Sequence, residues 1–462
     1  MANTTYDAII IGSGQGGGPI ATDLAQAGHK TALIEREHVG GTCVNVGCTP
    51  TKTMIASARA AYVVKRAADF GVYTGPVNVD MRRVRQRKRD IVTSYRQSSE
   101  QRTEQIQNLD LLRGEASFSG PKTLTVRFTN GETRQLTANT IIIDTGDSPA
   151  IPPIDGLDTV PYLDSTSIME LDSVPEHLVV VGAGYVALEF AQMFRRFGSQ
   201  VTILQRGPQI LSKEDEDIAS EMAKILQEDG ITIRTGTSPT HVQKAAENTI
   251  HITVKSEKGE ETLTASHLLL ATGRRPNTRH LNLEAAGIKT DQKGYVQVNE
   301  RLETNVTGVY AIGDVKGGPA FTHISYDDYR ILRANLLHHG SATTRGRLVP
   351  YTIFTDPQLG RVGLSEKEAK AQNITYRVAR LPMSSVSRAL EVDEPRGVMK
   401  ALIDPESKQI LGCAILGIDG GEIMSMIEIA MMGKLPYTAL KDGVFTHPTL
   451  AESLNSLFTS IE

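Results

Sequence analysis

Residues 9–17 read Ile-Ile-Ile-Gly-Ser-Gly-Gln-Gly-Gly, and this stretch decides the fold of the N-terminal region. An apolar strand ends in the glycine pattern Gly12-x-Gly14-x-x-Gly17, from which we expect a helix that extends to about Ala27. The next apolar strand, at 31–34, ends in Glu35. Glycines at these places let the backbone approach a pyrophosphate, whose charge then faces the N-terminus of the helix. The stretch therefore predicts a strand–helix–strand unit that binds a dinucleotide.

The same pattern occurs a second time at 178–187, Leu-Val-Val-Val-Gly-Ala-Gly-Tyr-Val-Ala, which contains Gly182 and Gly184. Its helix is expected to reach about Phe197, and the strand at 201–204 ends at Gln205. Gly182 precedes Gln205 by 23 residues, just as Gly12 precedes Glu35. A single glycine pattern is a weak signal, but two in the same register predict two Rossmann-like units.

The two units differ where each would meet a ribose. Glu35 can accept hydrogen bonds from a ribose 2′-hydroxyl, which suits the unphosphorylated adenosine ribose of FAD. Gln205 and Arg206 stand at the equivalent place in the second unit. Because this unit has an arginine and no carboxylate there, it should prefer the 2′-phosphate of NADPH over NADH. The alternative is that Arg206 simply points into solvent.

The second unit interrupts the first. Residues 141–146 (Ile-Ile-Ile-Asp-Thr-Gly) and 268–273 (Leu-Leu-Leu-Ala-Thr-Gly) share a strand-to-glycine form, and 308–314 return to a buried strand and turn. We therefore expect an α/β protein with a split FAD-binding domain at 1–147 and 272–344, an NAD(P)-binding domain at 148–271, and a C-terminal α+β domain at 345–462.

The C-terminal domain has alternating strands, such as 397–403, and a methionine-rich helix from about Glu422 to Gly433. Such a methionine stripe is more typical of a core or a subunit interface than of a cofactor site.

Composition excludes several classes of protein. The 462 residues carry a net charge of −4, with a pI near 6.3, which argues against a generic polyanion binder such as a nucleic-acid-binding protein. No apolar run approaches the ~20 residues of a membrane span. A strand begins at Tyr6 and leaves no room for a signal peptide, so we expect a cytoplasmic protein. The basic run from Arg82 to Arg89 is interpreted as the solvated face of a helix, with a phosphate or nucleic-acid patch as the alternative.

Two of the three cysteines, Cys43 and Cys48, lie five residues apart. A disulfide that closes so short a loop stabilises a fold little, so the pair is interpreted as an exchangeable dithiol. Such a pair needs a nearby positive charge or a helix N-terminus to lower the pKa of a thiol, so that the reactive thiolate forms. Pro50 fits the first turn of a helix, and Lys52 supplies a positive charge two residues later. The alternatives are a buried pair or half of a zinc site, but the sequence has no second ligand pair, so no metal is expected. Cys413 lies in an apolar strand and is expected to be an inert core residue.

Over essentially its whole length the chain resembles the class I pyridine nucleotide–disulfide oxidoreductases, the family of glutathione reductase, dihydrolipoamide dehydrogenase and mercuric reductase. The resemblance rests on five motifs: Gly12-x-Gly14-x-x-Gly17, the Cys43/Cys48 pair, Gly184-Tyr185-x-x-x-Glu189, Ala311-Ile312-Gly313-Asp314 and His447-Pro448-Thr449-x-x-Glu452.

For the cofactors, the resemblance implies that Asp314 holds the FAD ribityl chain. Lys52 would lie by the flavin N5, paired with Glu189, and Tyr185 would gate the nicotinamide pocket. The full predicted set of cofactor-binding residues is Gly12, Gly14, Gly17, Glu35, Thr42, Lys52, Thr145, Gly146, Asp314, Gly182, Gly184, Tyr185, Glu189, Arg206 and Gly273.

For the chemistry, the resemblance implies that Cys48 is the flavin-side sulfur and Cys43 the outer sulfur that meets the substrate. His447, oriented by Glu452, would be the acid–base group that reaches the dithiol of the other subunit. This role implies an obligatory homodimer, and the C-terminal domain would be its dimerisation domain. Without the family match, His447 could equally belong to a loop before a helix.

The motifs resemble two different branches of the family. Residues 42–52 look most like mercuric reductases, whereas Phe321-Thr322-His323-Ile324-Ser325 and the residues to Arg330 look more like flavoproteins that protect bacteria from reactive chlorine species and hypothiocyanous acid. The segment 457–462 lacks the paired cysteines that hand mercury over in mercuric reductases. Asp144 departs from the alanine that the family usually carries before Thr-Gly, and the sequence offers no physical reason for it.

The predicted function is an NADPH-dependent, FAD-containing reductase that uses the Cys43–Cys48 pair to reduce a small thiol-reactive oxidant or a soft metal ion. One alternative is a dihydrolipoamide dehydrogenase or another disulfide reductase, although Gln205-Arg206 argues against the NADH-linked branch. The other alternative is a flavin-binding redox sensor without turnover.

Overall fold

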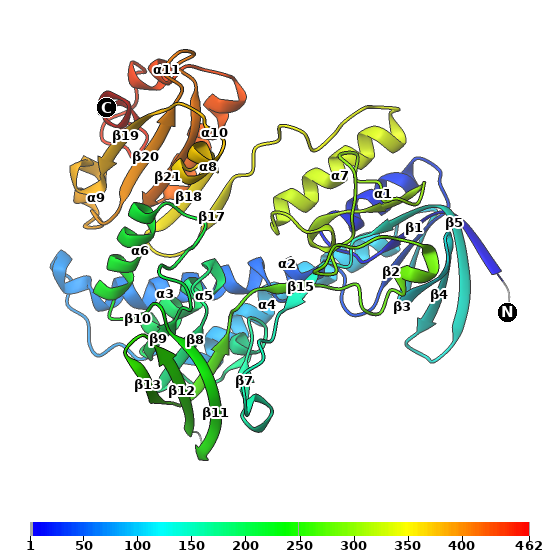
Figure 1. The fold of residues 1–462 in the computed structure, drawn as a ribbon, viewed down its shortest axis with the longest axis horizontal. Helices are drawn as coiled ribbons and strands as arrows, with labels where there is room; N and C mark the ends of the chain where they lie inside the picture. The colour runs from blue at the N-terminus through cyan, green and yellow to red at the C-terminus, as the bar shows by residue number, and fades with distance from the viewer. Residues whose placement is uncertain (1–2, 248, 462) are drawn as a thin grey trace. The chain divides into compact units, whose positions relative to one another are not determined.

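The computed structural model describes residues 3–247 and 249–461, which form two compact units. The first unit combines residues 3–53 with Arg83–Ala150 and Gly273–Arg347. The second combines Met54–Arg82 with Ile151–Thr272 and residues 348–461. Each unit is described by itself (Figure 1).

The first unit is built on a parallel sheet with the strand order β3-β2-β1-β5-β16. Ile10 in the central strand pairs with Leu33 on one side and with Ile142 on the other. These strands are continuous apolar runs because both faces of the sheet are covered. Their bounds are β1 (Asn3–Ile11), β2 (Thr31–Glu35), β3 (Leu109–Gly120), β5 (Thr133–Ile143) and β16 (Val309–Ala311).

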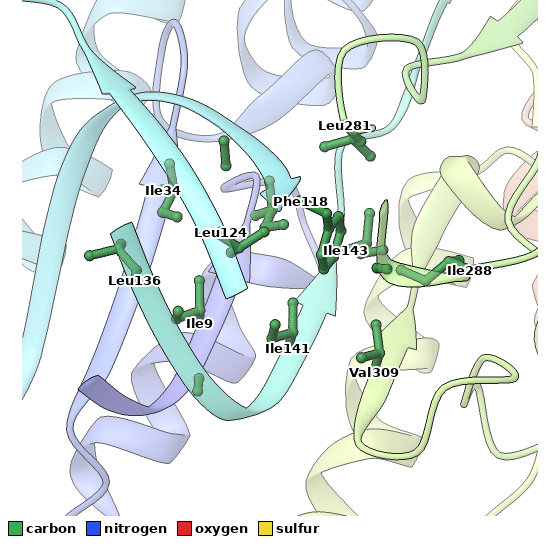
Figure 2. Packing of buried hydrophobic residues seen from close by; sticks show 14 of the residues in the cluster. Ile9, Ile34, Phe118, Leu124, Leu136, Ile141, Ile143, Leu281, Ile288 and Val309 are labelled. Carbon is green, nitrogen blue, oxygen red and sulfur yellow. The ribbon is translucent and has the colours of Figure 1, made fainter. Parts of the chain in front are cut away.

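Each face of this sheet has its own core. On one face, β4 (Thr123–Phe128) pairs antiparallel with β3 and with β5, and Phe118 and Leu124 pack against Ile9 and Ile141 (Figure 2). On the other face, a second apolar cluster joins the sheet to α1 (Gly17–Gln26) and α7 (Thr322–Leu337), which contact each other.

Three helices follow the second strand: α2 (Gly41–Asn45), α3 (Cys48–Lys65) and α4 (Met81–Glu104). The basic run lies on α4, and Arg82, Arg83 and Arg89 are exposed as predicted for a solvated face. Lys88 is the exception, because it is buried, so the prediction of a uniformly solvated basic face is wrong at this position.

The second unit contains a parallel sheet with the order β10-β9-β8-β14-β7. One face packs against an antiparallel three-stranded sheet through a buried apolar cluster that includes Val179, Leu268 and Ile252. The helices α5 (Tyr185–Phe197) and α6 (Glu216–Glu228) belong to the same strand–helix–strand pattern. The strand bounds are β7 (Tyr162–Leu163), β8 (His177–Val181), β9 (Gln200–Leu204), β10 (Thr232–Arg234), β11 (Ser238–Ala246), β12 (Thr249–Ser256), β13 (Gly259–Ala265) and β14 (His267–Leu270).

The same unit contains an antiparallel sheet with the order β17-β18-β21-β20-β19. The methionine-rich helix α10 (Gly420–Met432) packs on it, with Met424 and Ile427 buried and Ile429 and Met432 exposed. The remaining elements are β17 (Tyr351–Ile353), β18 (Gln358–Gly363), α8 (Glu366–Ala371), β19 (Arg377–Pro382), α9 (Ser387–Glu391), β20 (Val398–Ile403), β21 (Ile410–Gly417), α11 (Tyr437–Lys441) and α12 (Ser453–Thr459).

In each of the two parallel sheets, one strand leads through a glycine turn into a helix. This arrangement confirms the α/β class and the two Rossmann-like units. Cys413 lies fully buried in β21, and burial raises the pKa of its thiol to about 12. The domain boundaries at 147, 271 and 344 stay predictions. No helix among the described residues is long and apolar enough to cross a membrane.

Candidate active site

The redox pair lies at the junction of two helices in the first unit. Cys43 sits in α2 and Cys48 is the first residue of α3, so a helix N-terminus stands at the pair, as its predicted chemistry requires. Neither cysteine forms a disulfide; Cys43 is partly buried and Cys48 is exposed. A hydrogen bond between the two side chains raises the pKa of Cys43, and burial acts in the same direction. Cys43 therefore keeps its proton in this arrangement.

Thr322, a residue that the sequence did not single out, also touches the pair. Its Oγ1 lies 3.4 Å from Sγ of Cys48, although the two residues are 274 positions apart. Thr322 begins α7, within the segment that resembles the reactive-chlorine flavoproteins. That resemblance was the only sequence signal for it.

Lys52 lies one helical turn after Cys48 on α3, and residues four apart share a face of a helix. Glu189 lies in α5 of the second unit, where it is buried and accepts a hydrogen bond from the backbone N–H of Phe354 at 2.9 Å. The pairing of Lys52 with Glu189 stays a prediction.

The first glycine turn is shaped for a close backbone approach. Gly12 has φ of +100°, and a Cβ there would lie 2.3 Å from the carbonyl oxygen of Asp144. Gly17 begins α1, so the N-terminus of that helix faces the turn. At the end of β2, the Glu35 carboxylate accepts hydrogen bonds from the backbone N–H and the hydroxyl of Ser13 at 3.1 and 2.6 Å. Thr42 lies in α2 beside Cys43.

Asp314 is half-buried and belongs to a group of polar residues near the ends of β5 and β16. Its side chain hydrogen-bonds Asp147, whose Oδ1 accepts a hydrogen bond from Nε of Arg274 at 2.6 Å. Burial and the negative charge of Asp147 raise the pKa of Asp314 to about 7. Asp147 and Arg274 were missed from the sequence, because their pairing depends on the short strands β6 (Asp147–Pro149) and β15 (Arg274–Pro276).

Three further predicted residues lie along the same edge of the first unit. Thr145 donates its hydroxyl to the carbonyl of Asn277 at 3.0 Å, and Gly146 accepts the backbone N–H of Asn277 at 3.0 Å. The carbonyl of Gly273 accepts the N–H of Ala150 at 2.9 Å.

The second glycine turn repeats the geometry of the first. Gly182 has φ of +105°, and a Cβ there would lie 2.4 Å from the carbonyl oxygen of Ala271. Gly184 is the N-cap of α5 and Tyr185 its first residue. Arg206, just beyond β9, is exposed and makes no hydrogen bond or ion pair with any described residue. Its guanidinium is therefore available to a ligand.

His447 and Glu452 are brought together near the C-terminal end of the chain. Nδ1 of His447 lies 2.8 Å from a carboxylate oxygen of Glu452, and the histidine side chain is 67% exposed. The carboxylate fixes one ring nitrogen and leaves the other free to act on a group outside the subunit.

Residues 6–328 match the family described as "Pyridine nucleotide-disulphide oxidoreductase", and residues 349–458 match its dimerisation domain. The chain belongs to this family. The "Probable pyridine nucleotide-disulfide oxidoreductase RclA" of Escherichia coli (strain K12) is 38% identical over 461 residues, which cover 99% of each chain. A "Mercuric reductase" of Staphylococcus aureus is 36% identical over 450 residues, 97% of this chain and 81% of that protein. The structure of the "Cu(II) complex of HOCl-induced flavoprotein disulfide reductase RclA from Escherichia coli" is similar with a TM-score of 0.90 and 37% identity, and covers 99% of both chains.

As a pyridine nucleotide–disulfide oxidoreductase, the chain is a flavoprotein enzyme, and the predicted family and enzyme class are confirmed. The family uses FAD and NAD(P)H. The matched dimerisation domain indicates a homodimer. The roles predicted for the individual site residues stay predictions.

Proposed function

We propose that this oxidoreductase transfers electrons from NADPH through FAD to the Cys43–Cys48 pair, and that the resulting dithiol reduces a small thiol-reactive oxidant or a soft metal ion. The observation that carries this proposal is the geometry of the pair: two hydrogen-bonded thiols, Cys43 in α2 and the exposed Cys48 at the start of α3. A small reactant needs only access to these sulfurs.

The residues of the first unit fit FAD. The cradle at Gly12 leaves no room for a Cβ, α1 presents its N-terminus, and Glu35 and Asp314 offer acceptors for ribose and ribityl hydroxyls. Thr42, Thr145 and Gly146 complete the proposed site. When bound, FAD supplies the hydride-accepting chemistry that connects NADPH to the disulfide.

The two thiols of the pair supply the electrons and protons for the reduction of the substrate. Against a two-electron oxidant, Cys43 and Cys48 give up two electrons and two protons and become a disulfide. Against Cu(II), the same oxidation reduces two ions to Cu(I) and releases two protons. Because the pKa of Cys43 is raised by its hydrogen bond to Cys48 and by burial, it needs a base to react as a thiolate. His447 of a second subunit, oriented by Glu452, is the proposed base.

Relatives support the substrate class. The E. coli RclA structures are described as HOCl-induced, two of them are described as Cu(II) complexes, and other relatives are mercuric reductases. Thiolates favour soft metal ions, and they are also nucleophiles that attack reactive chlorine species and related electrophilic oxidants. The preference for NADPH rests on Arg206, which is exposed and lies just beyond the strand that would meet the adenosine ribose.

The test is an NADPH-oxidation panel with Hg(II) in excess thiol, Cu(II), hypothiocyanous acid, oxidised glutathione and lipoamide. We expect sustained turnover with the first three and little with the two larger disulfides. The Cys43→Ser/Cys48→Ser double variant measures turnover that bypasses the dithiol. High activity with glutathione disulfide contradicts the proposal, and oxidation that stops after one equivalent of NADPH favours a redox sensor.

A further inference from the structure

Asp144 is the residue that departs from the family pattern, and the structure places it directly under the first glycine turn. It follows β5 and is 6% exposed. Oδ2 accepts the backbone N–H of Gly17, the first residue of α1, at 2.7 Å. A Cβ built on Gly14 would lie 2.6 Å from Oδ2, and one built on Gly313 would lie 2.7 Å from Oδ1. The carboxyl group therefore lies between the glycine turn and the turn that precedes Asp314.

The second nucleotide unit provides an internal comparison. Ala271 stands where Asp144 stands: each follows a central strand, precedes Thr-Gly, and presents its carbonyl oxygen to the first glycine of a turn, Gly182 or Gly12. The two turns have nearly the same φ, +105° and +100°. A methyl group is thus sufficient to build this kind of turn. The carboxyl group of Asp144 must be explained by something other than folding of the loop.

The charges around Asp144 favour its neutral form. Burial raises its pKa well above the usual range. The hydrogen bond from Gly17 lowers this pKa, whereas the negative charges of Asp314, Asp328 and Glu35 raise it further. Asp328 itself pairs with two cations, Lys316 and Arg347, at 3.2 and 2.7 Å. Within the described residues, no cation contacts Asp144, and its Oδ1 has no hydrogen-bond partner. The Ser325 hydroxyl lies near the same place, because a Cβ built on Gly313 would approach both Oδ1 of Asp144 and Oγ of Ser325.

We propose that Asp144 is a further FAD-binding residue. Its side chain is a neutral carboxylic acid, which accepts a hydrogen bond from the N–H of Gly17 with Oδ2 and donates a hydrogen bond from the Oδ1 hydroxyl to the pyrophosphate of FAD. The inference rests on the proposed location of FAD at the first glycine turn. A helix N-terminus normally gives its N–H groups to a phosphate, and here a carboxyl group takes one of them. That substitution is compatible with a nearby pyrophosphate only when the carboxyl group is uncharged and can return a donor.

The consequence is a pH-dependent affinity. Below its raised pKa, Asp144 is neutral and donates a hydrogen bond; above it, the ionised group repels the pyrophosphate. FAD affinity should therefore fall as pH rises, by up to about tenfold per pH unit where one proton is linked to binding. Asp314 also titrates in this region and contributes its own step. The contribution of Asp144 is the difference between wild type and a variant that cannot ionise at this position.

The experiment measures FAD binding to the full-length protein freed of its flavin, by quenching of FAD fluorescence between pH 6 and pH 9. Asp144→Asn keeps an acceptor for Gly17 and a donor on the other side without a charge. We expect it to bind FAD with a clearly flatter pH profile than wild type, leaving the Asp314 step. Asp144→Ala removes the donor, and we expect about tenfold weaker binding than for Asp144→Asn.

Asp110→Asn is the matched control, because Asp110 lies in the same sheet and accepts the hydroxyl of Tyr6 at 2.8 Å. It should keep the wild-type profile. Calorimetry in two buffers of different ionisation enthalpy should show that wild type takes up more protons on binding FAD at high pH than Asp144→Asn does. Circular dichroism of each flavin-free variant checks its fold.

Parallel pH profiles for wild type and Asp144→Asn, or equal FAD affinity of Asp144→Ala and Asp144→Asn, overturn the inference and leave the proposed function intact. A wild-type protein that binds no FAD at all overturns both.

Discussion

At the scale of single residues, the two paired thiols differ from the third. We expect Cys43→Ser and Cys48→Ser each to retain bound FAD and to lose substrate reduction, because each removes one half of the exchangeable pair. Cys413→Ala is the control: its thiol is buried, with a pKa raised to about 12, so activity should be unchanged. FAD content and NADPH turnover are the measurements. Normal turnover by either serine variant would exclude the dithiol from the reaction.

Arg206 carries the prediction of nucleotide choice. Arg206→Glu should raise KM for NADPH by about tenfold or more and change KM for NADH little, because a charged hydrogen bond to the 2′-phosphate is worth about 1.5–3 kcal/mol. Arg206→Lys keeps the positive charge, and its KM for NADPH should lie between those of the wild type and of Arg206→Glu. Equal effects of Arg206→Glu on both nucleotides would mean that the guanidinium does not contact the 2′-phosphate.

At the scale of elements, strand β20 places a buried lysine among carboxylates. Nζ of Lys400, 1% exposed, lies 2.9 Å from Asp215 and 3.1 Å from Asp217, and it also pairs with Glu366. These acids lie at the start of α6 and of α8, so Lys400 ties both helix ends to the C-terminal sheet. A cation thus already occupies the one acidic cluster found among the described residues.

Lys400→Met should lower the free energy of unfolding by about 3–5 kcal/mol, because it leaves the buried carboxylate of Asp215 without its counter-charge. Lys370→Met is the matched control: this exposed lysine pairs with Glu366 at 3.6 Å, and its loss should cost no more than about 0.5 kcal/mol. Urea denaturation followed by circular dichroism measures both. Similar midpoints for the two variants would show that the cluster does not depend on Lys400.

The elements also show what the sequence could predict. The glycine turns and the strands that enter them are local patterns, and their register alone indicated two nucleotide-binding units. The contact of Thr322 with Cys48 joins residues 274 positions apart, and Arg274 meets Asp147 only because β6 and β15 pair. Such contacts depend on the path of the chain. Lys88 was misassigned for a similar reason: a basic run does not show which of its side chains the fold buries.

At the scale of the whole molecule, the homodimer completes the proposed chemistry. Within the matched dimerisation domain, Ile429 and Met432 of α10 are 66% and 68% exposed, and apolar side chains of this kind are suited to contact a second subunit. His447 and Glu452 form their pair in the same domain, with one histidine nitrogen available. If that nitrogen serves Cys43 of the other subunit, neither subunit has a complete site of its own.

Subunit mixing tests this sharing directly. Cys43→Ser and His447→Ala dimers should each be nearly inactive. In a heterodimer of the two, one site combines an intact Cys43 with an intact His447 and the other site lacks both. Random exchange makes about half of the dimers mixed, so the mixture should recover about one quarter of wild-type turnover. Mixing Cys43→Ser with Cys48→Ser is the control, because each subunit then lacks a thiol of its own pair and no site can be restored. A mixture of Cys43→Ser and His447→Ala that stays inactive after proven exchange would place His447 and Cys43 in separate functions.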